Sequence, residues 1–125
     1  YTVVGPFMGL ISSVSYGAGP VAGDTMASHA GWTEAGNANA PTYTGTRKTA
    51  VWSAASAGAK ALSDALSFAI TGTGTIKGSF LVFYTNAVAT KDDAHGTLIS
   101  AGLFSGGDRA VQNGDTVNVS YTLSA

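Results

Sequence analysis

TVNVSYTL, residues 116–123, is the stretch of this 125-residue chain that decides its fold class. Apolar and polar side chains alternate strictly along it, and the apolar ones are Val117, Val119, Tyr121 and Leu123. Because successive side chains of a strand point to opposite faces, this period of two places the four apolar side chains on one face. The alternation and the β-branched residues together predict a half-buried β-strand.

The segments upstream of this strand predict two hairpins. Residues 113–115, Asn-Gly-Asp, tolerate positive φ and favour a tight turn that pairs residues 109–112 with the final strand. Further upstream, residues 66–71 alternate in the same way, and glycines separate them from a second strand-like run at residues 76–84. Gly78 stands in the apolar row of that run, which predicts a bulge or a close backbone approach at this position.

Three further runs fit strands less cleanly, at residues 7–16, 48–53 and 97–104. Residues 54–66 are the helical candidate, because three of their apolar side chains have helical spacing. Gly58 and several serines weaken that pattern, so at most a short helix or turn is expected there.

Many short strands separated by turn signals favour an all-β fold over alternating β–α units. We therefore predict one domain over residues 1–125, a single antiparallel β-sandwich of the jelly-roll or Ig-like type. Residues 17–46 break the strand pattern, since they contain Pro20, Pro41 and a Gly- and Asn-rich stretch. They are predicted to form a long irregular loop or arm that something outside the domain uses.

The charges of the chain are few and evenly scattered. Six Lys and Arg residues face seven Asp and Glu residues without a run of like sign, so nucleic acid is not an expected partner. Charged residues make up 10% of the chain, against about 25% in an ordinary domain. A weakly charged surface suits close contact with other proteins in a large assembly. The longest strongly apolar stretch, residues 80–84, is far shorter than the roughly 20 residues that span a bilayer, so no membrane segment is predicted.

The residues that carry chemistry do not form a recognisable catalytic or metal-binding motif. The chain has no cysteine and only two histidines, His29 and His95, and no Gly-x-Ser-x-Gly motif accompanies them. Asp92, Asp93 and His95 lie close in sequence, but they supply too few ligands for a cation on their own. Glu34 is the only glutamate, and the sequence places no second carboxylate at the distance that a glycosidase needs. We predict no catalytic residue, no metal site and no cofactor.

Five segments resemble a group of small all-β structural proteins that tailed phages and prophages encode. Members of this group usually have additional residues before the position of Tyr1, so the chain is expected to have lost its N-terminus. The resemblance carries over no functional residue. The segments are FMGLISSVSY (residues 7–16), AGDTMASHAGWTE (22–34), GTIKGSFL (74–81), GTLISAGLFS (96–105) and NGDTVNVSYTLSA (113–125).

The resemblance implies a virion protein, assembled in the cytoplasm of the bacterial host, that does not act as an enzyme. A capsid decoration or cement protein is the favoured role, binding the major capsid protein or other virion proteins and forming a homo-oligomer in the assembled particle. The alternatives are a tail or fibre subunit and a carbohydrate-binding module that uses Trp32 and Trp52. Because aromatic side chains dominate protein interfaces, exposed Trp32 and Tyr43 are the predicted partner contacts.

Overall fold

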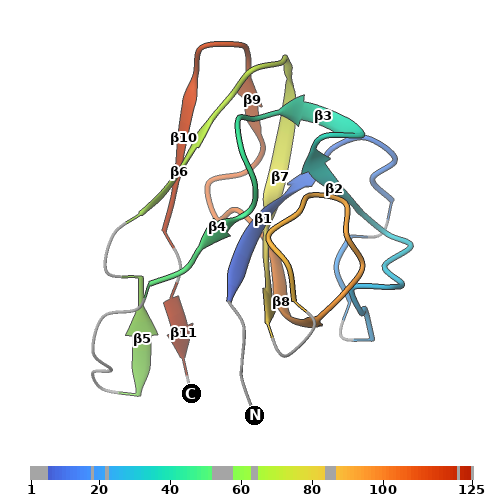
Figure 1. Cartoon of the computed structure of the whole chain (residues 1–125), viewed down its shortest axis with the longest axis vertical. Helices are drawn as coiled ribbons and strands as arrows, with labels where there is room; N and C mark the ends of the chain where they lie inside the picture. Colours follow the sequence, from blue (N-terminus) through green and yellow to red (C-terminus); the bar gives the residue numbers. More distant parts are fainter. Residues whose placement is uncertain are drawn as a thin grey trace.

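The secondary structure of the described residues consists of β-strands, which confirms the predicted all-β class. A computed structural model describes residues 6–17, 19–21, 23–51, 58–62, 65–83, 87–120 and 122–124 (Figure 1). No helix able to cross a bilayer is found among these residues. The strands are β1 Phe7–Ser12, β2 Thr33–Gly36, β3 Asn39–Thr42, β4 Lys48–Thr49, β5 Ala59–Ala61, β6 Leu66–Ala69, β7 Gly74–Phe83, β8 Thr97–Leu103, β9 Arg109–Val111, β10 Thr116–Val119 and β11 Thr122–Ser124.

Seven of the strands form one sheet with β1 and β7 at its centre. The order is β3-β2-β1-β7-β8, while β4 pairs with β1 and β9 pairs with β7. All pairings in this sheet are antiparallel except that of β2 with β3. The apolar side chains of β1 and β7 are buried on both faces of the sheet, so the two strands form the centre of the molecule.

The remaining four strands form two separate pairs, which follow one another along the chain and which we together call the ribbon. β6 pairs with β10 and β5 pairs with β11, both antiparallel, so the chain runs along the ribbon once in each direction. Figure 1 shows the β6–β10 part beside the main sheet and the β5–β11 part at the lower end of the view. Of the strand predicted over residues 116–123, residues 116–119 form β10 and residues 122–123 belong to β11, while Tyr121 lies outside the described residues.

Two apolar clusters lie on opposite faces of the main sheet. The first joins the sheet to the β6–β10 part of the ribbon, since Met8 and Leu10 of β1 belong to the same cluster as Phe68 of β6 and Val119 of β10. The second lies on the other face. Its members are Ile11, Met26, Trp32, Phe80, Val82 and Ala87, so the chain between β1 and β2 and the chain after β7 cover that face.

A bulge in β7 decides which face its side chains enter. Ile11 of β1 is opposite Gly78, whereas the next residue, Ser12, is opposite Ile76, so Lys77 is the additional residue of β7. The extra residue shifts the alternation by one, and Ile76 therefore enters the first apolar cluster while Phe80 enters the second. A Cβ atom on Gly78 would also collide with the carbonyl oxygen of Gly102 in β8. The predicted bulge and close backbone approach are both confirmed.

Replacing Gly78 with alanine is expected to lower the free energy of unfolding by about 1–3 kcal/mol, because the new methyl group meets backbone rather than a side chain that could move. Urea denaturation measures the loss. Gly102→Ala is the matched control on the neighbouring strand, since a Cβ there meets nothing within 4 Å. Equal losses in the two variants would contradict the close approach.

The two predicted hairpins are wrong, although the strands that would form them exist. The turn at residues 112–115 is present, since Asp115 N donates to Gln112 O at 3.0 Å. Its two strands nevertheless separate, because β9 pairs with β7 in the main sheet and β10 pairs with β6 in the ribbon. Among the described strands β6 pairs with β10 alone, so β6 and β7 do not form a hairpin with each other.

The prediction of one irregular loop or arm over residues 17–46 is also wrong, because β2 and β3 lie within it and belong to the main sheet. The strand expected over residues 7–16 ends at Ser12, and turns follow it. The strand expected at 97–104 is confirmed as β8. Of the predicted strand 48–53, residues 48–49 form β4 and Trp52 lies outside the described residues. The helical candidate 54–66 is only partly described, and β5 lies in the described part.

Candidate functional site

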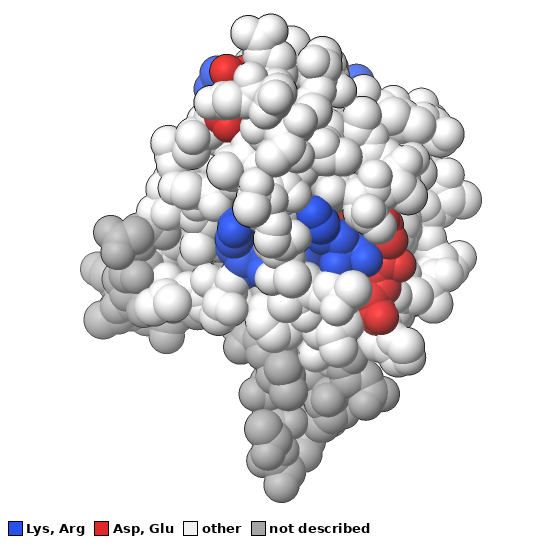
Figure 2. Space-filling model, turned by 45° about the horizontal axis from the view of Figure 1, so that its top comes forward, with Lys and Arg blue, Asp and Glu red and all other residues white. Residues whose placement is uncertain are grey.

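A buried ion pair between Glu34 and Arg47 is the strongest polar feature of the described chain. Arg47 Nε donates to Glu34 Oε2 at 2.8 Å, and Arg47 Nη2 donates to Glu34 Oε1 at 2.6 Å. Both side chains are buried, at 0% and 5% exposure. This two-bond geometry is the strong form of an arginine–carboxylate contact. Figure 2 shows Lys and Arg side chains in the middle of one face, with Asp and Glu side chains beside them.

Arg47 also holds the loop between β7 and β8. Its Nη1 donates to Val88 O at 3.0 Å and its Nη2 to Asp93 O at 2.8 Å. Its guanidinium carbon lies 5.3 Å from the centre of the Phe80 ring, within the range of a cation–π contact. One arginine therefore connects the carboxylate of β2, the loop after β7 and the second apolar cluster.

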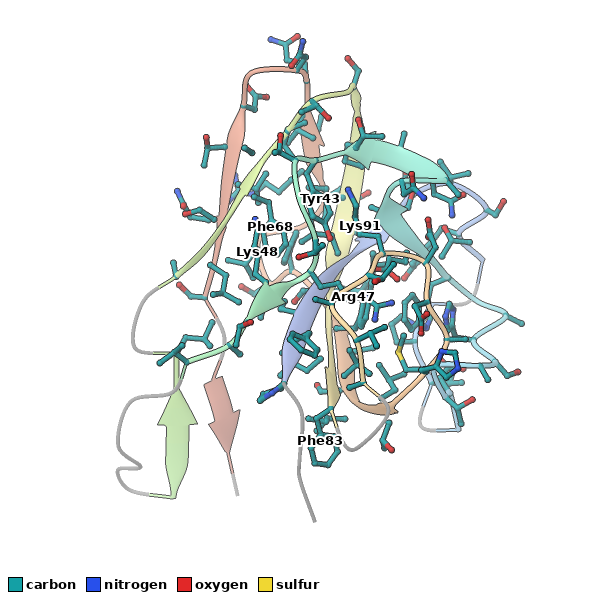
Figure 3. The ribbon with its side chains drawn as sticks, in the orientation of Figure 1. Tyr43, Arg47, Lys48, Phe68, Phe83 and Lys91 are labelled. Atoms are coloured by element: carbon teal, nitrogen blue, oxygen red, sulfur yellow. The ribbon has the colours of Figure 1, made fainter. Side chains whose placement is uncertain are left out.

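Two neighbouring residues of the same loop complete the network. Asp92 N donates to Glu34 Oε1 at 3.0 Å, and Lys91 Nζ donates to Gly36 O at 2.8 Å and to Tyr43 O at 2.7 Å. Lys91 Nζ also lies 4.4 Å from the centre of the Tyr43 ring. Figure 3 shows Tyr43, Arg47 and Lys91 grouped near the middle of the molecule. We call Glu34, Arg47, Lys91 and Asp92 the loop clamp.

The environment of the loop clamp changes the acidity of its members. Burial raises the pKa of Glu34, while the hydrogen bonds from Arg47 and from the Asp92 N–H act in the opposite direction. Burial lowers the pKa of Lys91 and raises the pKa of Tyr43, whose hydroxyl has no hydrogen-bond partner among the described residues. Glu34 and Arg47 satisfy each other, so their arrangement stabilises the loop.

The predicted partner contacts Trp32 and Tyr43 are not exposed, so that prediction is wrong. Trp32 is 1% exposed and Tyr43 is 2% exposed. The indole N–H of Trp32 donates to Asp24 Oδ2 at 2.9 Å, which lets the ring enter the second apolar cluster with its polar atom satisfied. Tyr43 packs edge-on against Phe68 in the first cluster, with 5.0 Å between ring centres. Trp32 consequently offers no platform for a sugar.

Asp24 supports a pH prediction. Hydrogen bonds from Val21 N–H and Trp32 Nε1 lower the pKa of Asp24 below its ordinary value of 3.8. A carboxyl whose pKa is lower in the folded state stabilises the fold above its ordinary pKa, and this contribution is lost as the pH falls through the folded-state pKa. Asp24→Asn is therefore expected to reduce the loss of stability between pH 5 and pH 3, measured by urea denaturation at both values. An unchanged acid loss in the variant would contradict this assignment.

The two histidines make local contacts, and one of them, His29, shares a hollow of about 260 Å³ with Glu34, Asp92 and Asp93. His29 stacks on Trp32 with 3.8 Å between ring centres, and its Nδ1 donates to Trp32 O at 2.8 Å. His95 Nδ1 lies 2.7 Å from Asp93 Oδ1, and the same carboxylate oxygen accepts a hydrogen bond from His95 N. Asp92 Oδ2 accepts from Ala38 N at 3.0 Å. Within the described ranges no group of three or more His, Asp and Glu residues could hold a metal ion.

One hollow of the described surface lies between β10 and the segment that runs from the end of β8 to Arg109 at the start of β9. It measures about 620 Å³, and a second hollow of about 350 Å³ continues it. The two share Arg109, Val117 and Asn118, and together they follow β10 along its length. We call these two hollows the β9–β10 groove. It exists because β9 and β10 leave the same turn and then join different sheets.

Comparison with protein-family models, with characterised proteins and with solved structures found no match to this chain. The candidate site therefore rests on the geometry of the loop clamp and of the β9–β10 groove. Sequence reasoning missed Arg47, Lys91 and the groove. The one available signal was that Glu34 is the only glutamate of the chain, which drew attention to the carboxylate but not to its partner.

Proposed function

We propose that this chain is a structural protein of a tailed-phage particle and that it decorates the outside of the capsid as a cement protein. Its partners would be the major capsid protein or other virion proteins, with further copies of the chain beside it. The structural observation that supports a binding role is the β9–β10 groove, where a strand edge faces an open hollow. The five sequence segments that resemble phage structural proteins support the virion assignment.

The loop clamp supports a structural role in a different way. The bidentate pair of Glu34 and Arg47 and the four backbone contacts of Arg47 and Lys91 fix the loop after β7 against the sheet. A loop that is held in one conformation loses little conformational entropy when a partner binds beside it. The low charge of the chain favours contact with other proteins over contact with a polyanion.

We also propose that the main sheet and the ribbon form the two layers of an antiparallel β-sandwich of the jelly-roll or Ig-like type. The first apolar cluster supports this arrangement, because its side chains come from both layers, with Met8, Leu10 and Leu81 from the sheet and Phe68 and Val119 from the ribbon.

The test uses phage particles in which the gene for this chain has been deleted. A cement protein stabilises the head, so the deleted particles should release DNA at a lower temperature than the parent, and adding the purified chain should restore the original release temperature. Deleted particles with unchanged heads that fail to bind the added chain would overturn the capsid role. Binding at the tail would instead favour a tail or fibre subunit.

A further inference from the structure

The outer edge of β10 has backbone groups that are free to bind another strand. The carbonyl oxygen of Ala69, opposite Thr116, accepts from Thr44 N at 2.9 Å and so points away from β10, while Ile70 N donates to Asp115 O at 2.8 Å, as in the hydrogen-bonded pairs of an antiparallel ribbon. Such pairs alternate with pairs whose N–H and C=O groups point away from the partner strand. In the register of β6 and β10, the outward pairs are those of Thr116 and Asn118. β10 pairs only with β6, and no described residue bonds to these outward groups.

The β9–β10 groove lies along this edge. Residues 116–120 line it on one side, a length of roughly 17 Å at about 3.4 Å a residue. β9 and the residues that follow β8 line it on the other side. The combined space lies within the range of roughly 300–1,000 Å³ that is typical of sites that hold a ligand. An extended segment of five or six residues matches this length.

The side chains at the groove indicate what such a segment would carry. Val111 and Val117 are partly buried and pack against the first apolar cluster, so they favour apolar side chains on the inward face of the segment. Arg109 is two residues from Val111 in β9, so its side chain lies on the same face of the strand. Arg109 is the one charged residue that lines the larger hollow, and it makes no ion pair with any described residue. The unpaired guanidinium favours a carboxylate between the apolar positions.

We propose that the β9–β10 groove binds an extended segment of a partner protein, which adds to the ribbon as a strand beside β10 and carries apolar side chains around a carboxylate that pairs with Arg109. This mode of recognition obtains affinity from main-chain hydrogen bonds and specificity from alternate side chains. The proposal rests on the proposed function, because it names how the chain contacts another virion protein. The partner segment is chemically an acidic, otherwise apolar β-strand.

The probe is the capped peptide acetyl-Thr-Val-Thr-Glu-Thr-Val-Thr-amide, whose second, fourth and sixth side chains enter the groove together. We expect it to shift the amide NMR signals of Thr116 and Asn118 in the full chain and to slow their hydrogen exchange, with a Kd of about a millimolar or tighter. The matched peptide with lysine in place of glutamate is expected to bind about twofold to fivefold more weakly. In Arg109→Glu, whose fold the NMR spectrum verifies, the preference should reverse.

Three results would overturn the proposal: no shift at Thr116 and Asn118 with millimolar peptide, shifts confined to another edge such as β3, or equal binding of both peptides to both variants. Shifts of the β10 signals that depend on protein concentration without peptide would replace the partner segment by a second copy of this chain. None of these outcomes concerns the presence of the chain in phage particles. A chain that is found in the particle and fails the peptide test would refute the groove inference and leave the proposed function standing.

Discussion

Replacing Arg47 with methionine is expected to lower the free energy of unfolding by about 3–5 kcal/mol at pH 7. The reason is that Glu34 stays buried at 5% exposure and loses both hydrogen bonds from the guanidinium, so an uncompensated charge remains in the interior. The carbonyl groups of Val88 and Asp93 lose their donors as well. Urea denaturation monitored by tryptophan fluorescence measures the change.

The pH dependence of this loss identifies its cause. Without Arg47, burial raises the pKa of Glu34 in the folded state against only the hydrogen bond from Asp92 N, while the pKa in the unfolded state keeps its ordinary value. A carboxyl of this kind binds its proton more tightly in the folded state, so the variant gains stability relative to the parent as the pH falls from 7 to 5. The double variant Glu34→Gln with Arg47→Met should recover part of the loss, because it buries no charge.

Asp108→Asn is the control for the Arg47 variant, because it breaks the exposed pair with Lys77, where the distance is 2.9 Å and Asp108 is 50% exposed. Exposed pairs contribute about 0–1 kcal/mol, so this variant should unfold close to the parent. An Arg47→Met variant within about 1 kcal/mol of the parent at pH 7 would show that the loop clamp is not a stabilising feature.

Replacing Phe68 with alanine is expected to cost about 3–5 kcal/mol, because Phe68 is fully buried where the ribbon meets the main sheet. Its ring packs edge-on against Tyr43, and Lys48 Nζ lies 6.0 Å from the ring centre. Figure 3 shows the three side chains close together. The substitution leaves a cavity between the two layers. Thermal and urea unfolding measure the loss.

Leu103→Ala is the matched control for the Phe68 variant, because it shortens an apolar strand residue that is 56% exposed. A change of less than about 1 kcal/mol is expected there. If Phe68→Ala unfolded no more easily than Leu103→Ala, the packing of the ribbon on the sheet would be wrong, and with it the β-sandwich proposal.

Local patterns in the sequence predicted the strands well and their pairing poorly. The alternation of Val117 and Val119 with polar residues correctly predicted a half-buried strand, and the turn at residues 112–115 also forms. Turn chemistry sets the direction of the chain over four residues, but it does not decide which sheet each strand joins. That choice depends on contacts between distant segments, such as the packing of Val119 with Phe68 and Met8 in one cluster.

The candidate site could not be predicted for a similar reason. Glu34 lies in the segment that was expected to be irregular, residues 17–46, and Arg47 follows that segment, 13 residues after Glu34. Arg47 reaches loop residues 41 and 46 positions further along. Trp32 and Tyr43 were expected at the surface because they lie in residues 17–46, which were predicted to form a loop or arm that a partner contacts. Asp24, which satisfies the indole of Trp32, comes from eight residues upstream, and no pattern in the sequence indicates this contact.

The most direct test of the central claim is the number of copies of this chain in purified phage particles, measured by quantitative mass spectrometry against the major capsid protein. A decoration protein is repeated over the shell, so we expect one copy for each capsid subunit or a simple fraction of that number. A few copies in each particle would contradict the decoration role and favour a tail or fibre subunit. Absence of the chain from the particles would contradict the proposed virion function as a whole.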